Sequence, residues 1–305
     1  MASYLERLAT RTEQVGSVLC LGLDPDPAAL PAGFPPTVAG IERFCRLLVE
    51  AAAPYAAAVK PNLAFFEAFG SAGIAALERI RAGLPGGILF VADAKRGDIG
   101  STAARQAVAL FDQLGSDAIT ASPYVGAEGL APFLERTDRY TYVLCRTSNP
   151  GSDELQGLTV AGGLDRVGPA GPDGGEPLYE RVARTVAGWG PGGTVGLVVG
   201  ATAPPELVRI RALTPGLGFL VPGVGAQGGE VEPVLSAGPA TAPPAGDRPG
   251  GGLLVNVSRG IARAALDGPS GAGSNRPADP AERVARAALN WSTTLAMPVL
   301  SYERS

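Results

Sequence analysis

The stretch "ILFVADAKRGDIGSTA", residues 88–103, joins an apolar run of strand length to the start of a helical pattern. Three charges in the order Asp-x-Lys-x-x-Asp stand at the junction, at Asp93, Lys95 and Asp98. Because side chains alternate along a strand, Asp93 and Lys95 are expected to point the same way. We therefore interpret the stretch as a strand that ends in charged side chains and leads into a helix.

Similar apolar runs recur along the whole chain, with helix-like segments between them. The expected strands are residues 17–23, 56–60, 88–95, 117–120, 141–147, 194–200, 218–223 and 253–258. The clearest helical patterns lie at residues 40–52, 73–83, 101–115, 177–189 and 204–214. Eight strands alternating with helices predict an α/β protein, specifically a (β/α)8 TIM barrel. A doubly wound open sheet gives the same alternation and is the alternative.

The chain is expected to form a single barrel domain over residues 1–305. Three segments rich in Gly and Pro, near residues 160–177, 237–252 and 267–280, interrupt the pattern. None of them resembles a linker between two cores, so we interpret them as mobile loop insertions.

The composition narrows the chemistry that the chain can perform. It contains no histidine, so proton transfer near neutral pH must use another side chain with a shifted pKa. Of its 25 basic residues only Lys60 and Lys95 are lysine. Unlike a guanidinium group, an ammonium group can give up a proton, so both lysines are candidates for a chemical role.

Other classes of function are disfavoured. A net charge of −4 argues against nucleic-acid binding, which usually requires a basic surface. No apolar run is long enough to span a membrane, and the first residues lack the pattern of a signal peptide, so a cytoplasmic location is expected. The widely spaced Cys20, Cys45 and Cys145 are expected to be buried free thiols, and no metal site is expected.

The charged residues at the strand ends are the candidate active site. In a barrel, Asp93 and Lys95 would face the interior at the carboxyl end, where active sites lie. Lys60 ends the preceding strand in "VKPN" and would lie beside them. Asp98 follows the strand and faces elsewhere. Alternating ammonium and carboxylate groups would keep one another ionised. A purely structural ion-pair network is the alternative.

Six motifs together resemble orotidine 5'-phosphate decarboxylase. "DAKRGDIGST" resembles the Asp-x-Lys-x-x-Asp-Ile signature of that family, and five other motifs follow the family's order over residues 17–265. These are "LGLDPDP", "VKPNLAFFE", "TSNPGS", "VPGVGAQGG" and "VNVSRGI". The chain is most similar to the longer bacterial, type 2 branch. The first signature alone also occurs in sugar-phosphate decarboxylases and aldolases of the same superfamily.

The resemblance implies a homodimer with shared active sites. Asp98, Ile99 and Thr102 would reach into the partner's barrel, which would explain why Asp98 stands off the strand. Asp24 and Lys60 would hold the ribose hydroxyls, although Asp24 could instead be a turn residue in "DPDP". Ser148 would contact the pyrimidine ring, with a turn before Asn-Pro as its alternative role.

The loops after the last two strands are candidates for phosphate binding, as is common in barrel enzymes. Glycines allow backbone N–H groups to approach an anion, and the Arg guanidinium matches phosphate oxygens. The glycine-rich loop alone could be only a turn. In the resembling family the loop that carries the glutamine closes over substrate. The residues assigned to this part of the site are Pro222, Gln227, Gly228, Ser258 and Arg259.

The implied reaction is the cofactor-free decarboxylation of orotidine 5'-monophosphate to uridine 5'-monophosphate in pyrimidine biosynthesis. Lys95 would stabilise the negative charge that forms at C6 and then donate a proton, while Asp93 would crowd the departing carboxylate. Two alternatives remain: a metal-dependent sugar-phosphate decarboxylase or aldolase, and a nucleotide-binding barrel without catalysis.

Overall fold

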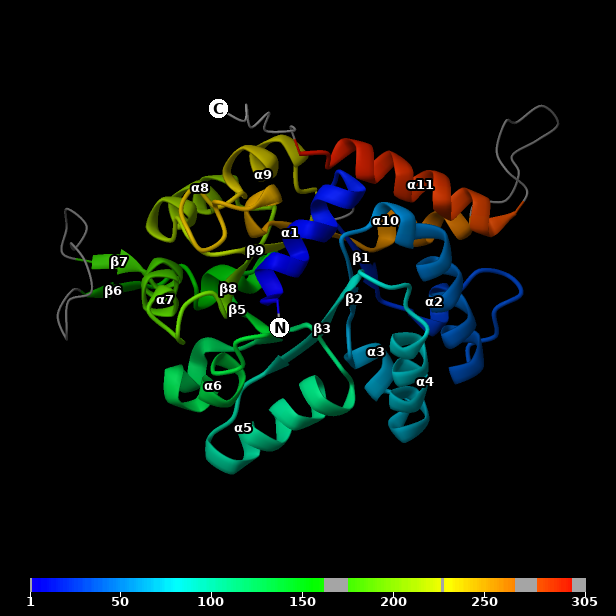
Figure 1. The fold of residues 1–305 in the computed structure, drawn as a ribbon, viewed down its shortest axis with the longest axis horizontal. Coiled ribbons are helices and arrows are strands. Elements are labelled where there is room, and N and C mark those ends of the chain that lie inside the picture. The colour runs from blue at the N-terminus through cyan, green and yellow to red at the C-terminus, as the bar shows by residue number, and fades with distance from the viewer. Residues whose placement is uncertain (1, 162–174, 226–227, 267–278, 298–305) are drawn as a thin grey trace.

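The computed structural model describes residues 2–161, 175–225, 228–266 and 279–297. Eight parallel strands close into a barrel, in which each strand pairs with the preceding one and the last pairs with the first (Figure 1). All eight expected strands are confirmed, and the closure of the sheet excludes the open-sheet alternative. The barrel strands are β1 Leu19–Leu23, β2 Ala58–Pro61, β3 Leu89–Arg96, β4 Ala118–Ala121, β5 Tyr140–Arg146, β8 Val195–Val199, β9 Phe219–Pro222 and β10 Leu254–Val257.

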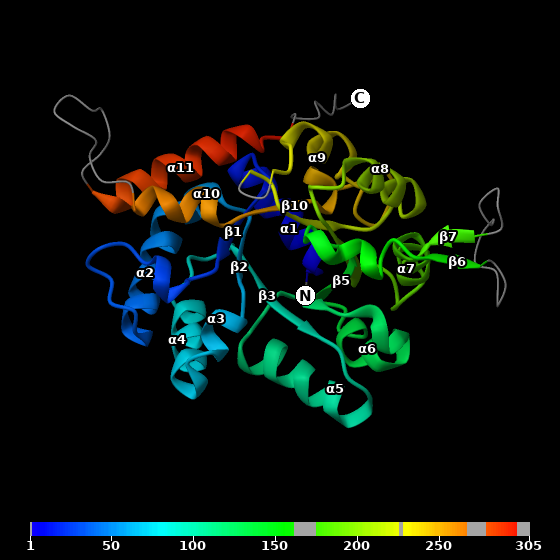
Figure 2. The ribbon, with the colours of Figure 1, turned by 180° about the vertical axis from the view of Figure 1, so that it is seen from behind.

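Helices surround the barrel (Figures 1 and 2). Their apolar side chains are buried against the strands in a common core. The helix expected at residues 101–115 begins as α5 and continues as a π-helix, Val108–Gln113. No helix in the described ranges is long and apolar enough to cross a membrane. The outer helices are α2 Val38–Ala52, α3 Ala64–Glu67, α4 Gly70–Ala82, α5 Gly100–Ala107, α6 Gly126–Leu134, α7 Leu178–Ala187, α8 Pro204–Leu213, α9 Val231–Ala237, α10 Arg259–Ala262 and α11 Pro280–Thr294.

An additional helix, α1 Tyr4–Val15, closes the amino end of the barrel (Figure 1). Ser3 and Glu6 form a capping box at its start. Tyr4 is fully buried, stacks on Tyr140 with ring centroids 4.8 Å apart, and shares a hydrogen bond of 3.1 Å with the Tyr142 hydroxyl. Since α1 occupies the amino end, small molecules must enter the barrel from the carboxyl ends of the strands.

Residues 237–252, predicted to be a loop insertion, make contacts with the rest of the barrel. They pack beside α1 at the amino end of the barrel, where Ala245 N–H donates to Gly216 O at 3.3 Å and Arg211 donates to Gly238 O at 2.5 Å. The segment lies before β10, so it is at the opposite end from the carboxyl termini of the strands and cannot form part of a lid there.

The other two insertions fall largely outside the described residues. Residues 159–161 and 175–177 form a short antiparallel pair, β6 Thr159–Ala161 and β7 Gly175–Pro177. Residues 162–174 and 267–278, together with Gln227, lie outside the described ranges. A single domain over residues 1–305 therefore stays a prediction.

Candidate active site

One carboxylate binds both lysines of the chain at the carboxyl end of the barrel. Asp93 Oδ2 lies 2.8 Å from Lys60 Nζ, and Asp93 Oδ1 lies 2.7 Å from Lys95 Nζ. β2 and β3 are adjacent parallel strands, which places these residues side by side. The structure thus brings together three of the four residues expected in the charge array.

Thr120 on β4 completes the surroundings of Asp93. Its hydroxyl donates to Asp93 Oδ1 at 2.9 Å and accepts from the Lys95 backbone N–H at 2.9 Å. Burial alone would raise the pKa of Asp93, but Lys60 and Lys95 outweigh this effect and hold that pKa well below its usual range. Asp93 is therefore a fixed negative charge.

Lys60 is also held in its charged form. Its side chain is only 5% exposed, and burial by itself would lower the pKa. The carboxylates of Asp93 and Asp24 outweigh that effect, so the pKa is raised above its ordinary value. Lys60 is therefore a buried cation, whereas the Lys95 side chain is half exposed.

Lys95 has an unusual backbone conformation. Its φ of 47° is in the left-handed region, and no other non-glycine residue in the described ranges has a positive φ. The pairing of β3 with β4 shifts register between Ala92 and Arg96, so the strand is irregular at this point. A left-handed non-glycine residue costs about 1–3 kcal/mol, and such strain is typical of functional sites.

A cavity of about 270 Å³ opens above this cluster. The charged cluster forms one side, while Leu144, Val198 and Leu220 supply apolar surface. Its other lining residues are Thr120, Thr147, Ser148, Asn149 and Pro222. Of the predicted binding residues, Ser148 and Pro222 thus line the same cavity as Lys60, Asp93 and Lys95.

The predicted phosphate-binding residues lie on the loops after β9 and β10. The β9 loop turns tightly through glycines, with Gly228 N–H donating to Gly225 O at 2.8 Å and φ values of 73° and 86° at these two residues. Ser258 precedes α10, and Arg259, its first residue, is exposed and makes no ion pair within the described residues. Gln227 lies outside the described residues.

Asp24 and three other predicted site residues are not among those that line the cavity, although the Asp24 carboxylate is close enough to Lys60 to raise its pKa. The Asp24 Oδ1 atom is buried and has no hydrogen-bond partner among the described residues. Asp98 accepts a hydrogen bond from Ile99 N–H at 2.8 Å, and the Ile99 side chain is 61% exposed. Thr102 is exposed in the first turn of α5. Nothing in the single chain brings Asp98, Ile99 and Thr102 to Asp93.

Sequence reasoning missed a group of polar contacts behind the loop that carries Ser148. We call this group, made by Arg146 with Ser152, Asp153 and Glu206, the Arg146 clamp. The Arg146 side chain, 7% exposed at the end of β5, donates to Ser152 at 2.8 Å and pairs with Asp153 at 2.8 Å and Glu206 at 3.2 Å. Gln156 accepts from Thr147 N–H at 2.9 Å. A strand ending in Arg is a weak signal, because the partners of Arg146 are not apparent from the sequence.

The fold and the site define a class of protein: a (β/α)8-barrel enzyme whose cavity holds a lysine–carboxylate–lysine cluster at the carboxyl ends of its strands. Residues 17–272 match the family model "Orotidine 5'-phosphate decarboxylase / HUMPS family". The chain belongs to this family.

Similar proteins cover nearly the whole chain. An orotidine 5'-phosphate decarboxylase of Herpetosiphon aurantiacus is 44% identical over 94% of this chain and 96% of its own length. One from Thermomicrobium roseum is 47% identical, over 85% of this chain and 86% of its own. The solved structure of Leishmania donovani OMP decarboxylase is 40% identical, with a TM-score of 0.72 over 96% of this chain and 100% of that one.

Proposed function

We propose that this enzyme decarboxylates orotidine 5'-monophosphate to uridine 5'-monophosphate, a step of pyrimidine biosynthesis. The similarity to curated decarboxylases over most of both chains supports the reaction. The observation that carries the proposal is the bridging of both lysines by Asp93 beside a cavity with an apolar side.

In this proposal the C6–carboxylate bond breaks and leaves its electron pair on C6 of the pyrimidine. The half-exposed Lys95 ammonium stabilises that charge and transfers a proton to C6, so that carbon dioxide leaves and Lys95 is briefly neutral. Asp93, which stays ionised, faces the departing carboxylate and repels it. Lys60 cannot take the place of Lys95, because it is buried and its raised pKa keeps its proton.

The remaining residues would bind the substrate away from the reacting centre. Ser148 would contact the pyrimidine. Asp24 would accept hydrogen bonds from the ribose hydroxyls, and Lys60 would donate to them. The unpartnered, buried Oδ1 of Asp24 supports this role, because such an acceptor is stabilised by a donor from the ligand. Arg259, Ser258, Gly228, Gln227 and Pro222 would surround the phosphate, whose binding energy helps to organise the site.

A homodimer with shared sites is part of the proposal. Asp98, Ile99 and Thr102 have no role in the cavity of their own chain, and Ile99 presents an exposed apolar side chain next to Asp98. In a dimer these residues would complete the partner's charge array. We also propose that the enzyme works in the cytoplasm.

The test is the change in ultraviolet absorbance when purified protein is mixed with orotidine 5'-monophosphate, with and without EDTA. We expect EDTA-resistant loss of substrate that is abolished in Lys95→Ala. No turnover by well-folded protein would contradict the proposal. Turnover only of sugar phosphates, lost with EDTA, would favour the metal-dependent alternative, and tight nucleotide binding without turnover would favour the non-catalytic one.

A further inference from the structure

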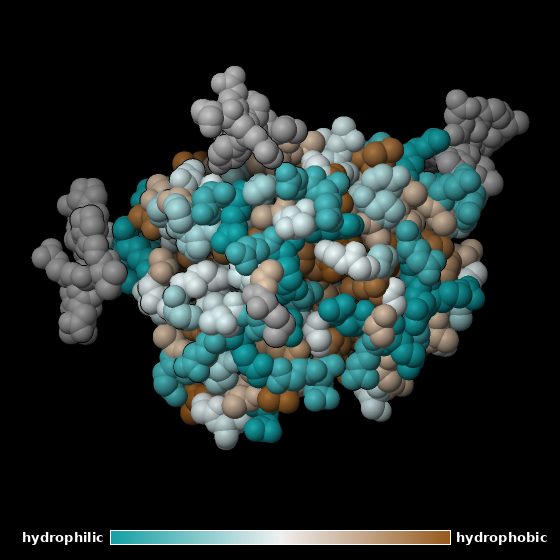
Figure 3. Space-filling view, viewed as in Figure 1, coloured by the Kyte–Doolittle hydropathy of each residue, from teal (hydrophilic) through white to brown (hydrophobic). Residues whose placement is uncertain are grey.

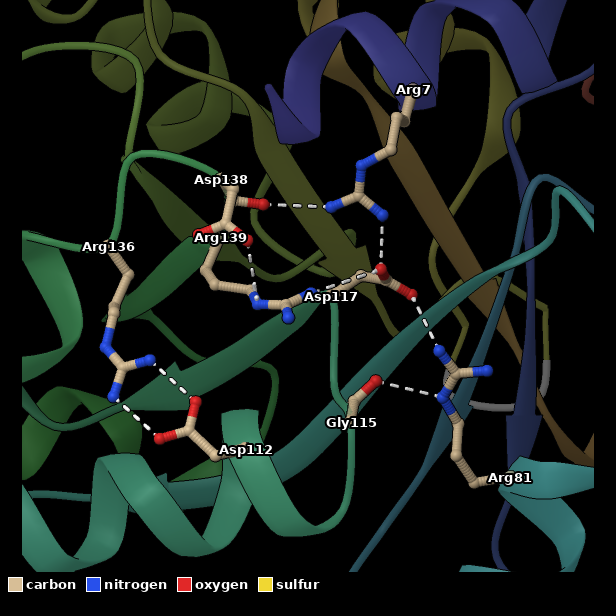
Figure 4. Close-up of polar contacts among 8 residues, drawn as sticks. All are labelled: Arg7, Arg81, Asp112, Gly115, Asp117, Arg136, Asp138 and Arg139. Carbon is tan, nitrogen blue, oxygen red and sulfur yellow. Dashed lines mark hydrogen bonds and ion pairs between the residues drawn. The ribbon is translucent and has the colours of Figure 1, made fainter. Parts of the chain in front are cut away.

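A second group of charged residues lies at the amino end of the barrel, opposite the catalytic cavity (Figure 4). Asp117, just before β4, is 6% exposed and faces three arginines from different parts of the chain. Arg7 from α1 is ion-paired and hydrogen-bonded to its Oδ1 atom. Arg81 from α4 lies 3.7 Å from Oδ2, and Arg139 lies 3.8 Å from Oδ1.

Asp117, Arg7 and Arg81 line a hollow of about 400 Å³ beside α1, the helix that Figure 1 shows across the amino end of the barrel. Arg7, Arg11 and Arg81 line it together with two acids, Glu6 and Asp117. Figure 3 shows mostly hydrophilic side chains on the face that it views, with hydrophobic patches between them. Residues 84–89, between α4 and β3, form another wall that is mainly apolar or glycine.

The lining holds three guanidinium groups but only two carboxylates to neutralise them. Asp117 also accepts a hydrogen bond from Phe90 N–H at 2.8 Å, and Glu6 is occupied by the capping box of α1. Among the described residues, Arg11 donates only to the backbone carbonyl groups of Ala53, at 2.5 Å, and Ala56, at 3.1 Å, and pairs with no carboxylate. Burial accordingly lowers the pKa of Arg11.

The arginines retain unused hydrogen-bond donors. Each guanidinium has five N–H donors in a planar fork that matches phosphate oxygens. Within the described residues, Arg7 Nε, Arg11 Nη1 and Arg81 Nη1 have no acceptor. The hollow is far larger than an inorganic phosphate ion requires and is in the size range of small-molecule sites.

We propose that this hollow is a second anion site, which binds a phosphate monoester. The phosphate group bridges Arg7, Arg11 and Arg81, and its organic part packs on the wall formed by Leu84 and Pro85. The site is separate from the catalytic cavity, because the buried core of the barrel lies between them and the two share no lining residue. It is also independent of the proposed function, since it uses none of the residues assigned to catalysis or substrate binding.

Gly86 offers a test that leaves every arginine in place. It lines the hollow, its φ is ordinary, and a Cβ at this position would meet nothing within 4 Å. Gly86→Glu would place a carboxylate at the rim to compete for the guanidinium groups, and Gly86→Gln is a neutral control of the same size. Arg136→Met is the second control, because Arg136 is already bound by both oxygens of Asp112, at 2.7 and 2.9 Å (Figure 4).

Binding of phenyl phosphate and inorganic phosphate would be measured by calorimetry in an Arg259→Ala background, which weakens the phosphate grip proposed for the catalytic site. We expect one remaining site per chain that binds phenyl phosphate more tightly than phosphate. Gly86→Glu and Arg81→Met should each weaken it at least about tenfold, whereas Gly86→Gln and Arg136→Met should not. Absence of binding, or equal binding by Gly86→Glu and Gly86→Gln, would overturn the proposal. Should Arg81→Met fold poorly, the Gly86 pair alone decides.

Discussion

Asp93 Oδ1 and Lys95 Nζ are 2.7 Å apart, although Lys95 is in a left-handed backbone conformation that interrupts the regular strand. The irregular backbone therefore carries the ammonium group back over the same carboxylate that binds Lys60. A strained residue held in this way suggests that the position of Nζ, and not only its charge, matters for the reaction.

Lys95→Arg tests the need for a transferable proton. The guanidinium keeps the positive charge but effectively never deprotonates, so we expect turnover to fall by roughly 10²–10⁴-fold. The measurement is the rate of absorbance change at saturating orotidine 5'-monophosphate. Arg96→Lys is the matched control: Arg96 is the next residue, but it pairs with Glu67, and it should keep near wild-type turnover. Full activity of Lys95→Arg would rule out Lys95 as the proton donor.

The lowered pKa of Asp93 predicts how stability depends on pH. Because this pKa is lower in the folded protein than in the unfolded chain, the stabilisation is present above the ordinary Asp value, about 3.9, and is lost as the pH falls through and below it. The measurement is denaturant unfolding at several pH values between about 6 and about 3. As the pH falls, the free energy of unfolding should decrease more steeply for wild type than for Asp93→Asn. Identical slopes would mean that Asp93 is not held ionised by the two lysines.

Mixed dimers test whether Asp98 acts in the partner's site. Lys95→Ala and Asp98→Ala subunits should each be nearly inactive alone, and a shared site predicts that one site of each heterodimer regains both residues. An equal mixture of the two variants would be unfolded and refolded, so that about half of the dimers are mixed. Because one of the two sites in each mixed dimer is intact, roughly a quarter of wild-type activity should return. Activity no higher than that of the separate variants would contradict a shared site.

The Arg146 clamp predicts an effect on substrate binding. Arg146→Met removes the bonds to Ser152, Asp153 and Glu206 and frees the loop that carries Ser148. We expect KM to rise about tenfold, the equivalent of roughly one hydrogen bond, with a smaller change in kcat. Arg209→Met is the control, since Arg209 is 62% exposed and pairs with Glu180 on the outer helix layer. A change confined to thermal stability would leave Arg146 as a purely structural residue.

The sequence predicted the barrel well because its main signal is local. Each apolar run could be assigned to a strand without knowing its neighbours, and Lys60, Asp93 and Lys95 follow from where those runs end. The bond from Thr120 to Asp93 could not be predicted, because it depends on the register of β3 and β4, which shifts beside Lys95. The place of residues 237–252 could not be predicted for a similar reason: their Pro and Gly content indicates a loop insertion, but it does not reveal the long-range contacts that the segment makes at the amino end.

Thr120→Val examines that unpredicted contact. The substitution keeps the branched shape but removes the hydroxyl that donates to Asp93 Oδ1 and accepts from Lys95 N–H, so the Lys95 backbone loses its support. We expect kcat to fall about 10- to 100-fold, as misplacement of a catalytic group can cost about 10²-fold. Thr141→Val is a close control, because the Thr141 hydroxyl is buried without a partner among the described residues. Its loss should therefore leave kcat unchanged and not reduce stability. If both variants lowered kcat equally, the effect would come from repacking of the barrel. A loss of kcat in Thr120→Val alone would show that the Thr120 hydroxyl helps to hold Lys95 in its strained conformation.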